Sequence, residues 1–151
     1  MNTTYQTYSS IVDNILNTAS SLTMINDFGN YHYTELNAIT NLKYPYFLIY
    51  LDEMNFDIVS NMKTYNINVM IFDKLYDDKS NLHTIKNDCS EIMNEFLQVL
   101  KTKKEDYNII LEVSENAVLF EEKFSDLTAG IAQKITIKTN NKLNKCKIMT
   151  K

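Results

Sequence analysis

The stretch Tyr65-Asn66-Ile67-Asn68-Val69-Met70-Ile71-Phe72 decides how this sequence folds. Its alternating pattern is typical of a β-strand, in which every second side chain points to the same face. One face then carries the apolar residues Tyr65, Ile67, Val69 and Ile71. Asn66 and Asn68 lie on the other face, which we therefore expect to be partly in contact with water. No other segment indicates a strand as clearly.

A second strand is expected just before this one. Residues 44–51 are dense in β-forming side chains, and Pro45, the only proline, stands near their start, where a missing N–H is tolerated. We expect Asp52-Glu53 to form an acidic turn after this strand. The two strands would then follow one another along the chain without a helix between them.

Three more strands are expected near the C-terminus. Residues 107–113 and 117–124 are predicted to be strands joined by a hairpin through Ser114-Glu115-Asn116. The last predicted strand covers residues 130–138. Its inward side chains are Ile131, Ile135 and Ile137, and its outward ones are Lys134, Thr136 and Lys138.

Two helices are indicated by apolar residues that recur at spacings of three and four. The first covers residues 5–22, and its apolar stripe needs a sheet or another helix to cover it. The second covers residues 82–101 and follows a segment rich in helix-capping residues. We expect Asp77 and Asp78 to cap the free N–H groups of this helix and to complement its dipole.

The order of elements predicts one domain of the α+β class, with a mainly antiparallel sheet of about five strands packed against two helices. Its parts are an N-terminal helix (1–23), a long loop (24–43), the sheet with the second helix (44–139) and a C-terminal tail (140–151). The loop has at most a short strand. Loops of this length usually serve binding or assembly, so its aromatic trio Tyr31-His32-Tyr33 is either an exposed contact patch or a set of partly buried anchors.

The charge balance argues against binding nucleic acid without regard to sequence. All 15 basic residues are lysine, the net charge is -4 and the pI is about 5.1, whereas such binding needs a cationic surface that displaces counterions from phosphates. The absence of arginine removes the side chain best suited to bidentate phosphate recognition. The candidate for a local basic patch is the lysine-rich tail of residues 134–151, which is either a DNA contact or a solvated strand face followed by the chain terminus.

No pattern in the sequence indicates an enzyme, a cofactor or a metal site. With two glycines in total, the chain has no place for a glycine-rich phosphate loop. The neighbouring acids Asp52-Glu53 and Glu121-Glu122 are expected to point to opposite faces of a strand, so the two members of each pair do not converge. His32 and His83 lack the spacing that would place two metal ligands on one face.

The two cysteines also lack ligand spacing. Cys89 is expected on the buried face of the second helix and Cys146 near the terminus, both reduced in a cytosol. The N-terminus has no signal-peptide pattern, and no apolar run approaches the ~18 residues of a membrane span. The sequence therefore predicts a protein that is made and used in a cytoplasm.

Three motifs within residues 25–139 carry a resemblance to a known family. The first is Leu42-Lys43-Tyr44-Pro45-Tyr46. The second closes the central strand and leads to the second helix, Phe72-Asp73-Lys74-Leu75-Tyr76-Asp77-Asp78-Lys79-Ser80-Asn81. The third is Phe120-Glu121-Glu122-Lys123-Phe124-Ser125-Asp126-Leu127-Thr128-Ala129-Gly130. Together they resemble short structural proteins of tailed bacteriophages that infect Bacteroidetes, including the crAss-like phages.

The third motif is similar to the family's "ERF-D-AG" stretch, with Lys123 where arginine often stands and Ile131 in place of a frequent tryptophan. Cys146 is similar to a cysteine often found near the family's C-terminus. The resemblance implies a tail-terminator-like or neck protein of the virion, made in the host cytoplasm. It would form a six- or twelvefold homo-oligomeric ring, with neighbouring neck, portal and tail proteins as partners.

In such a ring, the long loop and the strand edges would contact neighbouring subunits. The expected interface residues are Phe28, Tyr31, His32, Tyr33, Tyr44, Pro45, Phe124 and Asp126. DNA would pass through the lumen with passive contact only. From the net charge of -4 we expect a negative lumen that repels DNA phosphates. Two other functions stay open: a head-completion adaptor seated on the portal, and a small cytoplasmic regulatory binding protein of the phage.

Overall fold

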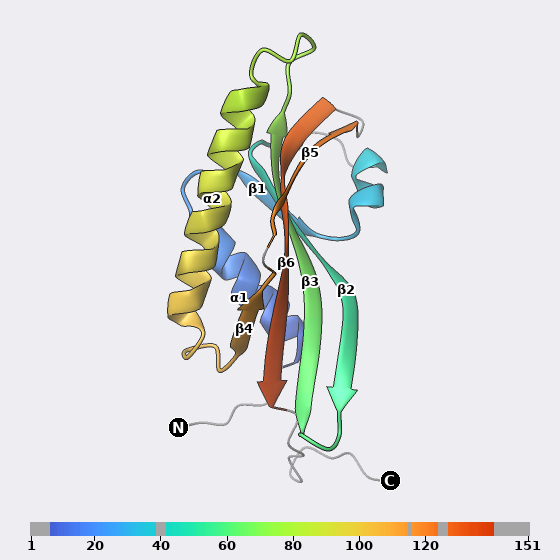
Figure 1. Cartoon of the computed structure of the whole chain (residues 1–151), viewed down its shortest axis with the longest axis vertical. Helices are drawn as coiled ribbons and strands as arrows, with labels where there is room; N and C mark the ends of the chain where they lie inside the picture. The colour runs from blue at the N-terminus through green and yellow to red at the C-terminus, as the bar shows by residue number, and fades with distance from the viewer. Residues whose placement is uncertain (1–6, 39–41, 115, 124–126, 141–151) are drawn as a thin grey trace.

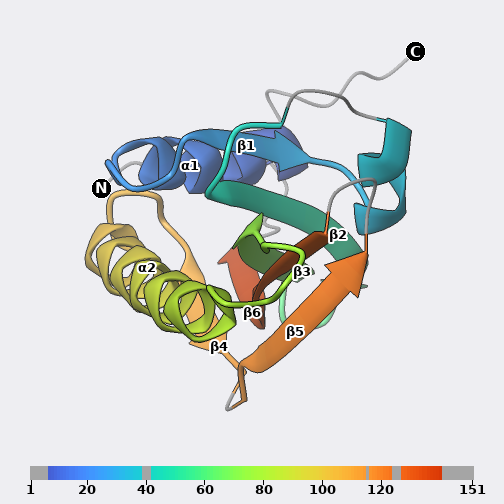
Figure 2. The ribbon, with the colours of Figure 1, turned by 90° about the horizontal axis from the view of Figure 1, so that it is seen from above.

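A computed structural model of the chain describes residues 7–38, 42–114, 116–123 and 127–140. It contains two helices packed on one face of a six-stranded, mostly antiparallel sheet, as the sequence predicts for an α+β fold (Figure 1). Viewed from above, α1 (Tyr8–Ser20) and α2 (Leu82–Lys103) lie on one side of the sheet, and the short helix η1 (Tyr33–Ala38) lies on the other (Figure 2). We call the side without α1 and α2 the helix-free face.

The helices begin and end close to the predicted positions. Helix α1 (Tyr8–Ser20) begins at a capping box, in which Thr7 and Ser10 bind each other's backbone N–H through their side chains. Helix α2 (Leu82–Lys103) runs two residues beyond the predicted end. Its buried residues are Ile85, Cys89, Ile92, Met93, Phe96 and Leu100, all of them in the predicted apolar stripe.

The sheet is built around two long central strands. Strands β3 (Met62–Lys74) and β6 (Leu127–Asn140) pair along their whole length, and β2 (Tyr46–Asp57) pairs with the other edge of β3. Both contacts are antiparallel. The short strand β1 (Asp27–Asn30) adds the one parallel pair among the described strands, along the first four residues of β2. The long loop therefore contains the short strand that the sequence allowed, followed by η1 (Tyr33–Ala38).

Strands β4 (Ile110–Val113) and β5 (Val118–Lys123) both pair with β6, in the same direction and one after the other. The predicted hairpin between them is therefore wrong, because the chain is interrupted near Ser114 but does not turn back. The break is held by Gln133 of β6, whose buried side-chain amide donates to the carbonyl and the hydroxyl of Ser114 at 2.6 Å. The antiparallel partner of β5 is β6.

The main core lies between the helices and the sheet. Alternate residues of β3 and β6 face it, including all four apolar residues predicted to share one face of β3 and the three isoleucines predicted inward on β6. Phe96 of α2 and Phe47 of β2 meet there with ring centroids 4.8 Å apart, and both are fully buried. The predicted wet side of β3 is confirmed at Asn66 and Asn68, which are half-buried on the helix-free face.

Two local predictions near acidic residues are wrong. Asp52 and Glu53 lie inside β2, not in a turn, and a β-bulge between Leu51 and Glu53 shifts the register there. Because of the bulge, both carboxylates reach partners on the helix-free face: Asp52 pairs with Lys134 at 3.1 Å, and Glu53 accepts from Asn66 at 2.7 Å. The expectation that they point to opposite faces is therefore wrong as well.

The second correction concerns the start of α2. Its N-cap residue is Asn81, which makes no side-chain capping bond, so Asp77 and Asp78 do not cap the helix. Asp78 instead accepts from the backbone N–H of Ser80, and this bond lowers the pKa of its carboxyl. The Asn81 amide accepts from Tyr76 N–H and donates to the Lys74 carbonyl, which joins the end of β3 to the helix.

Candidate functional site

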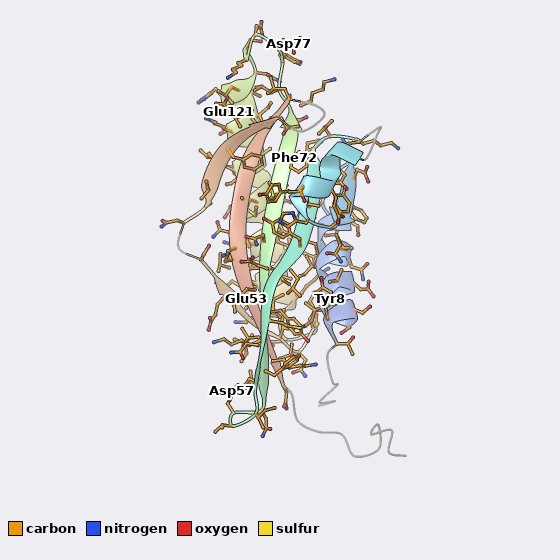
Figure 3. All side chains as sticks on the ribbon, turned by 90° about the vertical axis from the view of Figure 1, so that its right-hand side faces the viewer. Tyr8, Glu53, Asp57, Phe72, Asp77 and Glu121 are labelled. Carbon is orange, nitrogen blue, oxygen red and sulfur yellow. The ribbon has the colours of Figure 1, made fainter. Side chains whose placement is uncertain are left out.

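An aromatic cluster covers one end of the helix-free face (Figure 3, around the labelled Phe72). It is made of Tyr31, His32, Tyr33, Tyr44, Tyr46, Tyr50, Phe72 and Phe120. The rings of His32, Tyr33 and Tyr50 contact one another in tilted orientations. The centroid distances are 4.3 Å for His32–Tyr33, 4.9 Å for His32–Tyr50 and 5.9 Å for Tyr33–Tyr50. The hydroxyls of Tyr31 and Tyr46 are hydrogen-bonded to each other. Burial raises the pKa of both phenols above its ordinary value.

Both glycines of the chain make room for this cluster. Gly29 lies on β1 where a Cβ would meet the Tyr46 hydroxyl and the Tyr31 ring. Gly130 lies on β6 between its paired residues Phe72 and Phe120, whose rings meet edge to face at 6.4 Å. A Cβ at Gly130 would fall 2.7 Å from the Cα of Phe72. The glycines therefore act through close packing of strands and rings.

The structure brings four of the predicted interface residues together: Tyr31, His32, Tyr33 and Tyr44. Pro45 follows Tyr44 at the end of the long loop. The carbonyls of Tyr44 and Pro45 accept hydrogen bonds from the side-chain amide and the backbone N–H of Asn26, respectively. Phe28 lies apart from the cluster, because it pairs with Phe47 on the helix side of the sheet, where it is 42% exposed. Phe124 and Asp126 lie outside the described residues.

The aromatic trio of the loop is neither fully exposed nor fully buried. Tyr31 is half-buried, whereas His32 and Tyr33 are exposed. Tyr33 borders a cavity of about 180 Å³ on the helix-free face, which is also lined by Tyr50, Met70, Val118, Phe120 and Ala132. Tyr31 is therefore a partly buried anchor, whereas the contact role of the exposed His32 and Tyr33 stays a prediction.

Several titratable groups of the described residues have shifted pKa values or ion-pair partners. No three His, Cys, Asp or Glu side chains of these residues stand where they could hold a metal ion. The half-buried Asp73 has a carboxyl pKa that burial raises above its usual value. Glu121 pairs with Lys79 and Lys86 at 3.1 and 3.9 Å. None of the described helices is long and apolar enough to cross a membrane.

Cys89 is buried, as the sequence predicts, and its thiol should be inert. Burial raises its pKa to about 12, so almost none of it is thiolate at pH 8. In a Cys146→Ser variant, we expect no labelling of the native protein by a thiol reagent at pH 8. One thiol should be labelled after unfolding in guanidinium. Rapid labelling before unfolding would contradict the buried position of Cys89.

Among the described strands, the sheet is open at both edges. The outer edges of β1 and β5 are unpaired at one end, and two further open segments lie together at the other end. Beyond residue 49, no described strand pairs with the outer edge of β2, so residues 50–57 form the open β2 edge. On the opposite side, Ile110–Val113 pairs with β6 alone among the described residues and forms the open β4 edge. One row of paired residues joins the two edges across the sheet: Met54, Tyr65, Ile137 and Leu111.

Both open edges carry exposed apolar side chains that the sequence analysis did not single out. On β2 and the following turn, Met54 is 40% exposed, Phe56 53%, Ile58 74% and Val59 96%. On β4, Ile110 is 52% exposed and Val113 42%. Figure 3 shows how far this end of the sheet extends beyond the aromatic cluster, from Glu53 to Asp57 near the β2–β3 turn. Unpaired edges of this kind are normally blocked by charge or covered.

A groove runs beside the open β4 edge on the helix side of the sheet. This α2–β4 groove has a volume of about 300 Å³ and is lined by Asn94, Leu97, Gln98, Lys101, Lys104, Leu111 and Val113. Its floor is apolar through the three aliphatic residues. Lys101 and Lys104 add positive charge. The residues come from two elements whose contact appears only in the folded chain, so no sequence motif marks the groove.

Comparisons with known proteins add no relative from which a role could be transferred. No family model matches this sequence. A search of curated proteins finds no match either. The arrangement of the described residues is therefore the basis for a functional proposal: an aromatic cluster, two open sheet edges and the α2–β4 groove.

Proposed function

We propose that this protein is a structural subunit of a ring in the neck or tail connector of a tailed bacteriophage, where it joins head to tail and lets DNA pass. The single observation that supports the proposal is the pair of open sheet edges on opposite sides of one sheet. Two different unpaired strand edges on one chain favour head-to-tail contacts between copies. Such contacts close into a ring when the rotation from one subunit to the next allows it. The motif resemblance to phage structural proteins points to the same role.

The physical work of such a protein is assembly. Each copy would bury strand-edge backbone groups and apolar side chains against its neighbour, which removes the exposed apolar surface of Phe56, Ile58 and Val59 from water. The aromatic cluster lies at the other end of the sheet, where it offers tyrosine hydroxyls and ring faces to a different protein. Tyrosine is well suited to such contacts because it is apolar along its ring and polar at its tip.

The test is the presence and position of this chain in virions. Mass spectrometry of purified particles is expected to find its peptides, and imaging is expected to place it in a closed ring between portal and tail. The purified protein should also form species whose mass is a multiple of 17.6 kDa. Particles that lack the chain, together with a monomer at micromolar concentration, would contradict the proposal and favour a cytoplasmic regulatory protein.

A further inference from the structure

Resting on the proposed function, we infer that the partner of the open β2 edge is the open β4 edge of a second copy of this chain. The two strands pair antiparallel, and Met54 and Phe56 of one copy enter the α2–β4 groove of the next. Strand direction, the level of the two edges on the sheet, side-chain parity and charge all support this junction.

Strand direction favours this junction. β2 is antiparallel to β3, β3 to β6, and β6 to β4, so β2 and β4 run in opposite directions. Rotation about an axis roughly along the strands keeps the direction of every strand. Placing β4 of one copy beside β2 of the next therefore creates an antiparallel pair, and the alternation continues without a break. Antiparallel pairs are the slightly more stable kind and need no crossover connection.

The two edges also stand at the same level of the sheet. The pairing connects Leu51 through Ile67 and Ile135 to Val113, and it connects Met54 to Leu111 in the next apolar row. A neighbour rotated about the strand direction needs only a small shift along the strands to align its edge. Sheets that close into barrels require a shift of this kind between neighbouring strands. The open β2 edge is longer than β4, so β4 can shift along β2 and still pair with it.

Side-chain parity places Met54 and Phe56 of β2 on the same face as Leu111 and Val113 of β4, whereas Ile110 lies on the other face. Met54 pairs with Tyr65 and Phe56 with Lys63, and Tyr65 lies in the helix-side core. Leu111 and Val113 pair with Ile137 and Ile135, which lie in the same core. When the sheet continues from one copy to the next, Met54 and Phe56 therefore arrive on the groove side of β4. Glu53 and Asn55 arrive on the helix-free face.

Charge agrees with this direction of docking. Residues 50–57 contain Asp52, Glu53 and Asp57 and no basic residue. The groove contributes Lys101 and Lys104, both exposed. Opposite charges of this kind attract the two edges at long range. The carboxylates of Asp52 and Glu53 face the helix-free side, so they do not contact the lysines of the groove.

Disulfide cross-linking tests the junction in the full-length chain. In a Cys146→Ser background, four double variants combine Met54→Cys or Phe56→Cys with Leu111→Cys or Val113→Cys. Mild oxidation of assembled protein is expected to convert the monomer band into a ladder of covalent oligomers. In an antiparallel junction, a step forward along β2 moves the partner one step backward along β4. The Met54–Val113 and Phe56–Leu111 variants therefore cross-link in the same register. In a register shifted by two residues, either Met54–Leu111 or Phe56–Val113 cross-links, but not both.

The matched control replaces Asn55, which lies on the opposite face, and combines Asn55→Cys with Leu111→Cys or Val113→Cys. These variants should remain monomeric on a non-reducing gel. Cross-linking of both Met54–Leu111 and Phe56–Val113 would indicate a parallel junction and overturn the inference. So would efficient linking of Met54→Cys alone, which would indicate β2 pairing with β2 about a two-fold axis.

The outcome also separates this inference from the proposed function. Rings that are seen by imaging but give none of the expected cross-links leave the ring in place and reject this junction. Protein that stays monomeric and is absent from virions rejects the proposed function and the junction with it.

Discussion

Replacing Phe96 by alanine is expected to lower the free energy of unfolding by about 3–5 kcal/mol. Phe96 is fully buried between α2 and the sheet, and its ring packs against that of Phe47. The substitution removes the apolar contacts of the ring and leaves a cavity that rigid neighbours fill only in part. At about 2–4 °C per kcal/mol for a chain of this size, the melting temperature should fall by roughly 10 °C.

Thermal unfolding followed by circular dichroism measures this loss, and Glu95→Ala is the matched control. Glu95 is the preceding residue of the same helix and is exposed, so its replacement should change stability by no more than about 0.5 kcal/mol. Equal effects of the two substitutions would show that α2 does not pack on the sheet through Phe96.

Gly130→Ala should have the second-largest effect, a destabilisation of roughly 1–3 kcal/mol. The added Cβ would meet the backbone of β3, at the Ile71 carbonyl and the Phe72 Cα, and backbone atoms in the centre of a sheet cannot move aside cheaply. Alanine also makes the unfolded chain less flexible, which stabilises the fold by about 0.4–1 kcal/mol. The steric term is larger, so the net change should be a loss.

Gly29→Ala provides the comparison, and urea titration measures the free energy of unfolding of both variants. Its Cβ would meet the ends of the Tyr31 and Tyr46 side chains, which can rotate away. The loss should therefore be clearly smaller than at Gly130, although the hydrogen bond between the two tyrosines should be disturbed. A Gly130 variant that is as stable as the wild type would contradict the close approach of β6 to β3.

The regular elements could be predicted because their signals are local. The alternation in residues 65–72 and the apolar spacing in α1 and α2 each arise from one segment that presents one face to the core. The same reasoning failed at Asp52, because the β-bulge adds one residue and reverses the faces that follow. A bulge depends on the partner strand, and the acidic pair looks the same in a turn.

The interrupted edge could not be predicted for a related reason. Ser114-Glu115-Asn116 is typical of a tight turn, but whether the chain reverses there depends on β6. That strand is long enough to accept β4 and β5 in succession, and Gln133 satisfies the break. The candidate surface followed the same division: the loop aromatics were visible in the sequence, whereas Met54, Phe56 and the α2–β4 groove needed the sheet to be assembled.

The ion pairs of the helix-free face bear on how a ring of this chain would treat DNA. Lys134 is bound by Asp52 and Lys138 by Glu112, while Glu53 adds a further carboxylate. If this face lined the channel, the carboxylates of Asp52 and Glu112 would already neutralise the two ammonium groups before a phosphate passed them. Glu53 would leave one extra negative charge on the channel wall. DNA would then bind the channel wall only weakly, because each lysine is neutralised by a neighbouring carboxylate. This requires local pairing of charges and not an acidic protein overall. Genome release would depend little on ionic strength.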